Sequence, residues 1–280
     1  MDSSTTNTWS FLDTGSHDAF FNMAVDEVLL SRMKEQDARP VLRFYTWSRP
    51  SITIGYFQKV VDEFNLRDCE SRGWNVVRRL TGGRAVFHHQ ELTYSILLPR
   101  SAPGAGGSVL ESYRMLSNGL LNGLRLLGLD VELVSFHKKR QRRQRAGGRS
   151  PNCFDSPSWY EITVGGKKLV GSAQRRMSYG ILQQGSILIS MAGQREFNEV
   201  LQRSTDKKRK KTGEGMTSIT DILKGFHETD LLKESLIRGF RKALGVEFLQ
   251  TKLTRKEWKE TGRLGRERYR SQEWNWYGKS

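Results

Sequence analysis

The sequence predicts an α+β fold in which helices pack on a mainly antiparallel β-sheet. Strand-like runs occur in pairs joined by short turn signals, which is typical of hairpins. Amphipathic helical segments lie between these pairs and do not alternate with single strands, which argues against a parallel βαβ sheet. With 280 residues and 36% hydrophobic content, the chain can bury a full core.

The first half begins with a helix over residues 18–34, where apolar side chains recur at helical spacing and Asp18 is suited to cap the N-terminus. The turn signal Ser48-Arg49-Pro50 joins two strands, and residues 81–84 join two more. The expected strands are 41–47, 51–57, 75–80 and 85–98, and the further helices are 60–72 and 108–129.

The second half contains one clear hairpin, residues 160–164 with 168–173, because Gly165-Gly166 suits a type I′ turn. Short strands are expected at 131–136 and 181–190. From residue 194 to 280 the pattern is helical, and this part could either pack on the sheet or form a small cap. The expected helices are 194–202, 217–223, 230–244 and 255–271.

The chain is strongly basic, with 46 Lys and Arg against 30 Asp and Glu and a net charge of +16. Such a charge favours acidic partners. Two basic tracts, 138–145 and 207–211, contain no aromatic residue and so lack the stacking platform of a single-strand nucleic-acid binder. They fit either solvated loops, the first over about 137–150, or a docking patch for an acidic protein.

The sequence also bears on the compartment in which the protein works. No apolar run of about 18 residues occurs, so we expect no membrane span. The first residues lack the pattern of a secretory signal, and two cysteines without an export signal fit a reducing cytoplasm.

The segment 78–89 joins two strand candidates and carries adjacent glycines among arginines. Gly82 and Gly83 would let the backbone approach a ligand and present N–H groups to an anion or an acyl carbonyl. Walker spacing is absent, so this is no P-loop. An ordinary hairpin turn also fits these residues.

Cys153 stands between Pro151 and Pro157, upstream of Lys168. A free thiol with a pKa near 8.5 is a weak nucleophile at neutral pH, and a nearby cation such as Lys168 would activate it. An inert, buried thiol fits the residues equally well. His88 and His89 would point to opposite faces of a strand, so we expect a hydrogen-bonding or substrate-contact role and no metal site.

Several of these segments together resemble the lipoate–biotin protein ligase superfamily, namely 78–86, 91–95 and 166–174. Within it, residues 153–161 and 182–187 look most similar to the LipM-type octanoyltransferases. The resemblance covers about residues 8–280 and thins after about 200. It implies a mixed-sheet catalytic domain spanning the chain, residues 1–280, and a cofactor-free, metal-free acyl transfer.

The resemblance implies that octanoate arrives as a thioester on acyl carrier protein, and that the Cys153 thiolate takes it to form an acyl-enzyme. A lysine of a lipoyl-domain protein, chiefly the glycine-cleavage H protein, then accepts the octanoyl group. Lys168 would contact the acyl carbonyl and stabilise the oxyanion. We expect a monomer that binds neither nucleic acid nor membrane. The implied substrate-binding residues are Arg78, Arg79, Thr81, Gly82, Gly83, Arg84, Gly171, Ser172 and Ala173.

Two positions depart from the pattern of the relatives. His89 stands where an aspartate is expected, and Gln184 where a histidine is expected, which leaves the general base unassigned. The basic insert 138–148 also has no assigned role. Two related activities remain as alternatives: an octanoyl-[H protein]:protein amidotransferase, which also uses a cysteine, and an ATP-dependent lipoate ligase, which does not need Cys153.

Overall fold

A computed structural model describes residues 7–59, 65–135, 160–200 and 215–278. Cys153, the basic insert 138–148 and the tract 207–211 lie outside the described residues, so the expectations for them rest on sequence. Within the described residues no helix is both long and apolar enough to cross a membrane.

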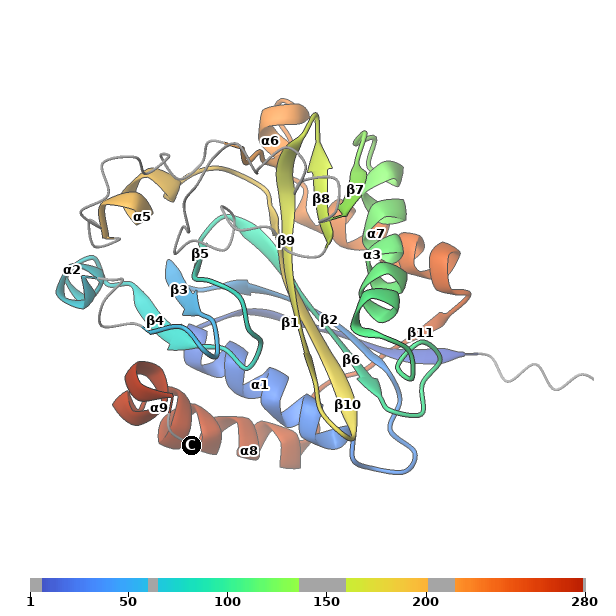
Figure 1. Ribbon diagram of the computed structural model, residues 1–280, viewed down its shortest axis with the longest axis horizontal. Coiled ribbons are helices and arrows are strands. Elements are labelled where there is room, and N and C mark those ends of the chain that lie inside the picture. The colour runs from blue at the N-terminus through green and yellow to red at the C-terminus, as the bar shows by residue number, and fades with distance from the viewer. Residues whose placement is uncertain (1–6, 60–64, 136–159, 201–214, 279–280) are drawn as a thin grey trace, which may run out of the picture.

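An eight-stranded sheet forms the centre of the fold, in the order β11-β1-β2-β6-β10-β9-β8-β7 (Figure 1). β1 pairs in parallel with both β11 and β2, and the other neighbours pair antiparallel, which confirms a mixed, mainly antiparallel sheet. The strands are β1 (Thr8–His17), β2 (Val41–Trp47), β6 (Glu91–Pro99), β7 (Glu132–Ser135), β8 (Tyr160–Val164), β9 (Lys167–Arg176), β10 (Gly180–Leu188) and β11 (Glu247–Gln250).

A second, three-stranded sheet lies beside the first, in the order β4 (Asn75–Arg78), β3 (Ser51–Ile54) and β5 (Val86–His88). The expected hairpin of residues 41–57 is therefore wrong: β2 and β3 belong to different sheets. The expected strand 85–98 likewise divides into β5 and β6. Alternation of side chains cannot reveal either change, because β2, β3, β5 and β6 are buried along nearly their whole length.

Helices cover both faces of the large sheet (Figure 1). On one face, α3 (Val109–Leu126) and α7 (Thr229–Leu244) pack against a core that includes Phe44, Tyr94 and Ile96. On the other face, α1 (Ala19–Arg32) contributes to a core with Tyr45 and Leu97. The expected cap is present, because Asp18 accepts a hydrogen bond at the start of α1. Ser108 also forms a capping box with Glu111 on α3.

The C-terminal helices pack against α1 and do not form a separate cap. The expected helix over 255–271 consists of α8 (Arg255–Leu264) and a π-helical turn (Gly265–Tyr269), and α9 (Gln272–Tyr277) follows. Arg32 of α1 pairs with Glu257 at 3.0 Å, and Trp274 joins the core beneath the sheet. The remaining helices are α2 (Leu66–Ser71), α5 (Gln194–Val200) and α6 (Ile219–Ile222).

Candidate active site

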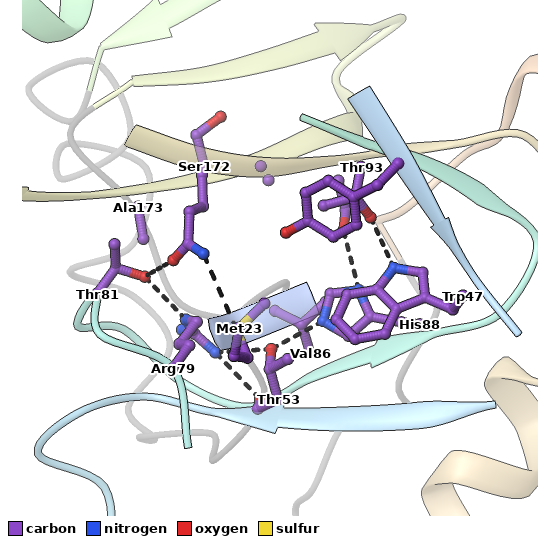
Figure 2. Close-up of a pocket in the computed structure, with 15 residues that line it drawn as sticks. Met23, Trp47, Thr53, Arg79, Thr81, Val86, His88, Thr93, Ser172 and Ala173 are labelled. Atoms are coloured by element: carbon purple, nitrogen blue, oxygen red, sulfur yellow. Dashed lines mark hydrogen bonds between the residues drawn. The ribbon is translucent and has the colours of Figure 1, made fainter. Parts of the chain in front are cut away.

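A pocket opens where the small sheet meets the face of the large sheet that α1 covers (Figure 2). The empty space in it is about 380 Å³, a volume that includes space open to solvent. Figure 2 shows Thr81, Arg79 and Ala173 on one side and Trp47, His88 and Thr93 on the other. The lining residues are Met23, Tyr45, Trp47, Thr53, Arg79, Thr81, Val86, His88, Thr93, Gly171, Ser172, Ala173, Gln184, Gly185 and Ser186.

Arg79 organises the glycine loop, defined here as residues 81–84. Its Nη2 donates to the carbonyl oxygens of Gly82 and Arg84, at 2.7 and 2.8 Å, and its Nε donates to Thr81 Oγ1 at 3.1 Å. Nη1 donates to the carbonyl and hydroxyl oxygens of Thr53 on β3. The guanidinium therefore lines the pocket and also holds the loop against the small sheet.

Gly83 and Gly55 allow the loop to sit close to β3. Gly83 has a φ of 93°, a conformation that residues with a side chain rarely adopt. A Cβ on Gly55 would lie 1.9 Å from the Gly83 carbonyl oxygen, so a side chain there is sterically excluded. Gly82 and Arg84 are half-buried and Gly83 is exposed, so these three lie at the loop's outer side and do not line the pocket.

Arg78 is placed differently from what the sequence suggested. Its side chain is buried and points away from the pocket, toward α9 and the segment after β3. The guanidinium donates to the backbone carbonyl oxygens of Gly55, Tyr56, Gln58, Trp274, Asn275 and Trp276. Arg78 thus joins the C-terminal helix to the strand that precedes the glycine loop, and it does not line the pocket.

His88 lines the pocket through its ring face rather than its nitrogens. Nδ1 lies 2.6 Å from Glu91 Oε1 and Nε2 lies 2.8 Å from Thr53 Oγ1, so both nitrogens have partners. The Trp47 ring stacks on the imidazole with centroids 4.1 Å apart. Trp47 and His88 therefore form one rigid side of the pocket, called here the Trp47–His88 wall. Neither nitrogen of His88 is turned to a substrate, because both are hydrogen-bonded within the protein.

Glu91 is hydrogen-bonded to both residues of this wall. The hydroxyls of Thr93 and Ser186 donate to its Oε1, each at 2.6 Å, and Trp47 Nε1 donates to the same oxygen at 3.2 Å. Burial raises the pKa of Glu91, but His88 and the two hydroxyls outweigh burial and hold that pKa below its ordinary value. The carboxylate is therefore ionised at neutral pH. Sequence reasoning had not assigned a role to Glu91, although its spacing of two from Thr93 places both on one face of β6.

A bulge in β9 sets the direction of Lys168. Ile162 of β8 pairs with Val170, whereas the next residue, Thr163, pairs with Lys168, so Leu169 is an extra residue. Leu169 and Val170 both pack in the core beneath α3 and α7. Alternation along the strand then turns Lys168 to the opposite face of the sheet.

Lys168 consequently shares a face with Gly171 and Ala173, which line the pocket. Its side chain is 2% exposed, and Nζ lies 2.9 Å from Glu161 Oε1, which is 3% exposed. Glu161 supplies the opposite charge that a buried ammonium needs. Ser172 also lines the pocket, and its Oγ lies 2.6 Å from the Tyr94 hydroxyl.

Comparison with known proteins agrees with this architecture. The family described as "Lipoyl protein ligase A/B catalytic domain" matches residues 18–241. The chain is 39% identical over 272 residues to the octanoyltransferase LipM of Staphylococcus aureus and 43% identical over 273 residues to that of Kyrpidia tusciae. Each match covers 96% of this chain and 98% of the relative.

Among solved structures, a crystal structure of lipoate-protein ligase A bound with ATP superposes with a TM-score of 0.77 at 26% identity, covering 96% of this chain and 98% of the other. An archaeal bipartite lipoate protein ligase from Thermoplasma acidophilum gives 0.78 at 24% identity, covering 96% of each, which shows the shared fold. The chain belongs to the lipoyl protein ligase A/B catalytic domain family. Within this family of acyl-transferring and ligating enzymes, it groups with the LipM octanoyltransferases.

Proposed function

We propose that this protein transfers an octanoyl group from octanoyl-acyl carrier protein to a lysine of a lipoyl-domain protein, chiefly a glycine-cleavage H protein. The acyl group would pass through a thioester on Cys153, without a cofactor, in the cytoplasm. The observation that carries the proposal is the bulge in β9, because it turns a buried, ion-paired lysine to the face of the sheet that lines the pocket.

In the first step, the Cys153 thiolate attacks the carbonyl carbon of the donor thioester. A new carbon–sulfur bond forms, the bond to the carrier's pantetheine sulfur breaks, and that thiolate leaves and takes up a proton. Negative charge develops on the carbonyl oxygen in the tetrahedral intermediate. The Lys168 ammonium would stabilise it, together with backbone N–H groups near Gly171.

In the second step, the ε-amine of the acceptor lysine attacks the Cys153 thioester. The amide bond forms, the carbon–sulfur bond breaks, and the amine loses a proton while Cys153 is regenerated. The octanoyl chain would lie in the pocket between Met23, Val86 and the Trp47–His88 wall. The surface that lines this pocket is largely apolar. Acyl carrier proteins and lipoyl domains are typically acidic, so the +16 charge would favour both encounters.

Intact-mass spectrometry after incubation with octanoyl-acyl carrier protein tests the proposal. We expect one octanoyl adduct, released by hydroxylamine, on the wild type and on C69A, and none on C153A. The C69A variant is the matched control because Cys69 is the chain's other cysteine. An adduct on C153A would mean that another residue carries the octanoyl group, whereas full activity of C153A with ATP and lipoate would favour an ATP-dependent lipoate ligase.

A further inference from the structure

We infer that Gln184 is a positioning residue of the acyl pocket: its amide fixes the direction of a buried hydrogen-bond chain that holds the glycine loop in place. The inference deepens the proposed function and rests on it for its effect on acyl transfer. The hydrogen-bond chain itself is a feature of the structure, so one part of the test does not depend on the proposed function.

The chain connects helix α1 to the glycine loop across the pocket. Gln184 Nε2 donates to Asp26 Oδ2, and Gln184 Oε1 accepts a hydrogen bond from Thr81 Oγ1 at 2.9 Å. Thr81 Oγ1 in turn accepts from Arg79 Nε at 3.1 Å. Figure 2 shows Thr81 and Arg79 together on one side of the pocket.

Only one direction of hydrogen bonding satisfies this chain. Asp26 forms an ion pair with Arg43 at 2.6 Å, and an ionised carboxylate can only accept, so the Gln184 amide must turn its NH₂ toward Asp26. Its carbonyl oxygen then faces Thr81, which must donate. Arg79 can only donate, so it supplies the hydrogen bond that Thr81 accepts. No hydroxyl proton of the chain remains to point into the pocket.

Both ends of the chain are fixed. At one end, Asp26 Oδ2 also accepts from Ser95 Oγ at 2.7 Å and from the Tyr45 hydroxyl at 3.3 Å. At the other end, Arg79 Nη2 donates to the carbonyl oxygens of Gly82 and Arg84. A change at Gln184 is therefore transmitted to the backbone of the glycine loop through two side chains.

The charged and titratable groups bonded within this hydrogen-bond chain or to its ends are Asp26 of α1, Arg43 and Tyr45 of β2, and Arg79 before the glycine loop. Arg175 of the neighbouring strand β9 donates from Nη1 to the Leu80 carbonyl oxygen, next to Thr81. Burial, followed by the charge of Asp26, raises the pKa of Tyr45 well above its ordinary value, so Tyr45 stays neutral. Gln184 itself cannot titrate, and the chain keeps one arrangement across neutral pH.

The substitution Q184E tests the direction of the chain. When protonated, the introduced carboxyl can donate to Asp26 and accept from Thr81, as the amide does. When it ionises, two carboxylates face each other at hydrogen-bonding distance and repel, so the chain breaks next to Asp26. The matched control is Q183E, because Gln183 is the neighbouring buried residue of β10 and faces the opposite side, where its amide meets Gln174 and Tyr94.

We expect the rate of acyl-enzyme formation by Q184E, divided by that of the wild type at each pH, to fall at least about tenfold between pH 5.5 and 8.5. The same ratio for Q183E should stay level, and Q184M, which cannot hydrogen-bond, should be slowed equally at every pH. The melting temperature of Q184E relative to the wild type should fall over the same range.

The inference would be overturned if neither the rate ratio nor the relative melting temperature of Q184E changed with pH. It would also be overturned if the rate ratio of Q183E fell with pH as steeply as that of Q184E. If the proposed function itself were wrong, the result would be different, because the wild type would form no acyl-enzyme. In that case the melting temperatures still test whether the chain has the direction described.

Discussion

Lys168 and Lys167 are adjacent in sequence but differ completely in environment. Lys167 is exposed, whereas Lys168 is buried, paired with Glu161 and turned to the face of the pocket. We predict that K168M slows acyl-enzyme formation by about 10²–10³-fold, because removing one group that stabilises an oxyanion has effects of this size. K167M should keep the wild-type rate. Stopped-flow or quenched intact-mass kinetics measure both, and a K168M variant as fast as K167M would contradict the role assigned to Lys168.

Cys69 provides an internal reference for thiol reactivity. Its side chain is 1% exposed, and burial followed by the charge of Asp68 raises its pKa to about 11. At pH 8 only about 0.1% of such a thiol is ionised. We predict that iodoacetamide leaves Cys69 unmodified in the native protein at pH 8 and modifies it in urea, as peptide mapping would show. Equal modification in both conditions would mean that Cys69 is accessible.

At the scale of single residues, the structure brings some of the predicted binding residues to the pocket and places others away from it. Arg79, Thr81 and residues 171–173 line the pocket, and their role in binding a substrate stays a prediction. Arg78 does not line the pocket, because neighbouring residues of a strand point to opposite faces, and one of two adjacent arginines had to face away from the site. The Trp47–His88 wall and its hydrogen bonds to Glu91 could not be predicted, because these three residues come from three strands in two sheets.

Helices α3 and α7 cross at a point where two glycines meet. A Cβ on Gly239 would lie 2.1 Å from the Gly123 backbone nitrogen, so the helices would have to move apart. We predict that G239A lowers the free energy of unfolding by about 1–3 kcal/mol, the usual cost of overpacking a core. G262A in α8, where the new Cβ would meet only the end of Arg266 at 3.5 Å, should be neutral or stabilising by up to about 1 kcal/mol. Urea unfolding compares the two, and equal stabilities would contradict close packing at this crossing.

At the scale of secondary structure, amphipathic helices and the Gly165-Gly166 hairpin were predictable, because their periodicity and turn residues are local signals. β1 and β11 were missed. β1 lacks a regular alternation of buried and exposed residues, and β11 has only four residues, three of them exposed and none buried. Their parallel pairing joins residues more than 230 apart in sequence, which no local pattern encodes.

The net charge of the whole molecule predicts how it meets its donor. A charge of +16 attracts an acidic carrier protein over long range, and salt screens this attraction. We predict that kcat/KM with octanoyl-acyl carrier protein falls by roughly tenfold between 50 and 500 mM salt. The rate with octanoyl-N-acetylcysteamine, a small neutral donor, should hardly change. Equal salt dependence with both donors would show that the charge does not steer the encounter.

A single-turnover chase tests the central claim, that Cys153 carries the octanoyl group between two proteins. The octanoyl-enzyme is isolated free of donor and ATP, mixed with a glycine-cleavage H protein, and both proteins are followed by intact mass. We predict that the enzyme loses its adduct as the H protein gains one octanoyl group on its lipoyl lysine, in equal amounts. An adduct that stays on the enzyme, or is lost only to water while the H protein remains unmodified, would contradict the claim.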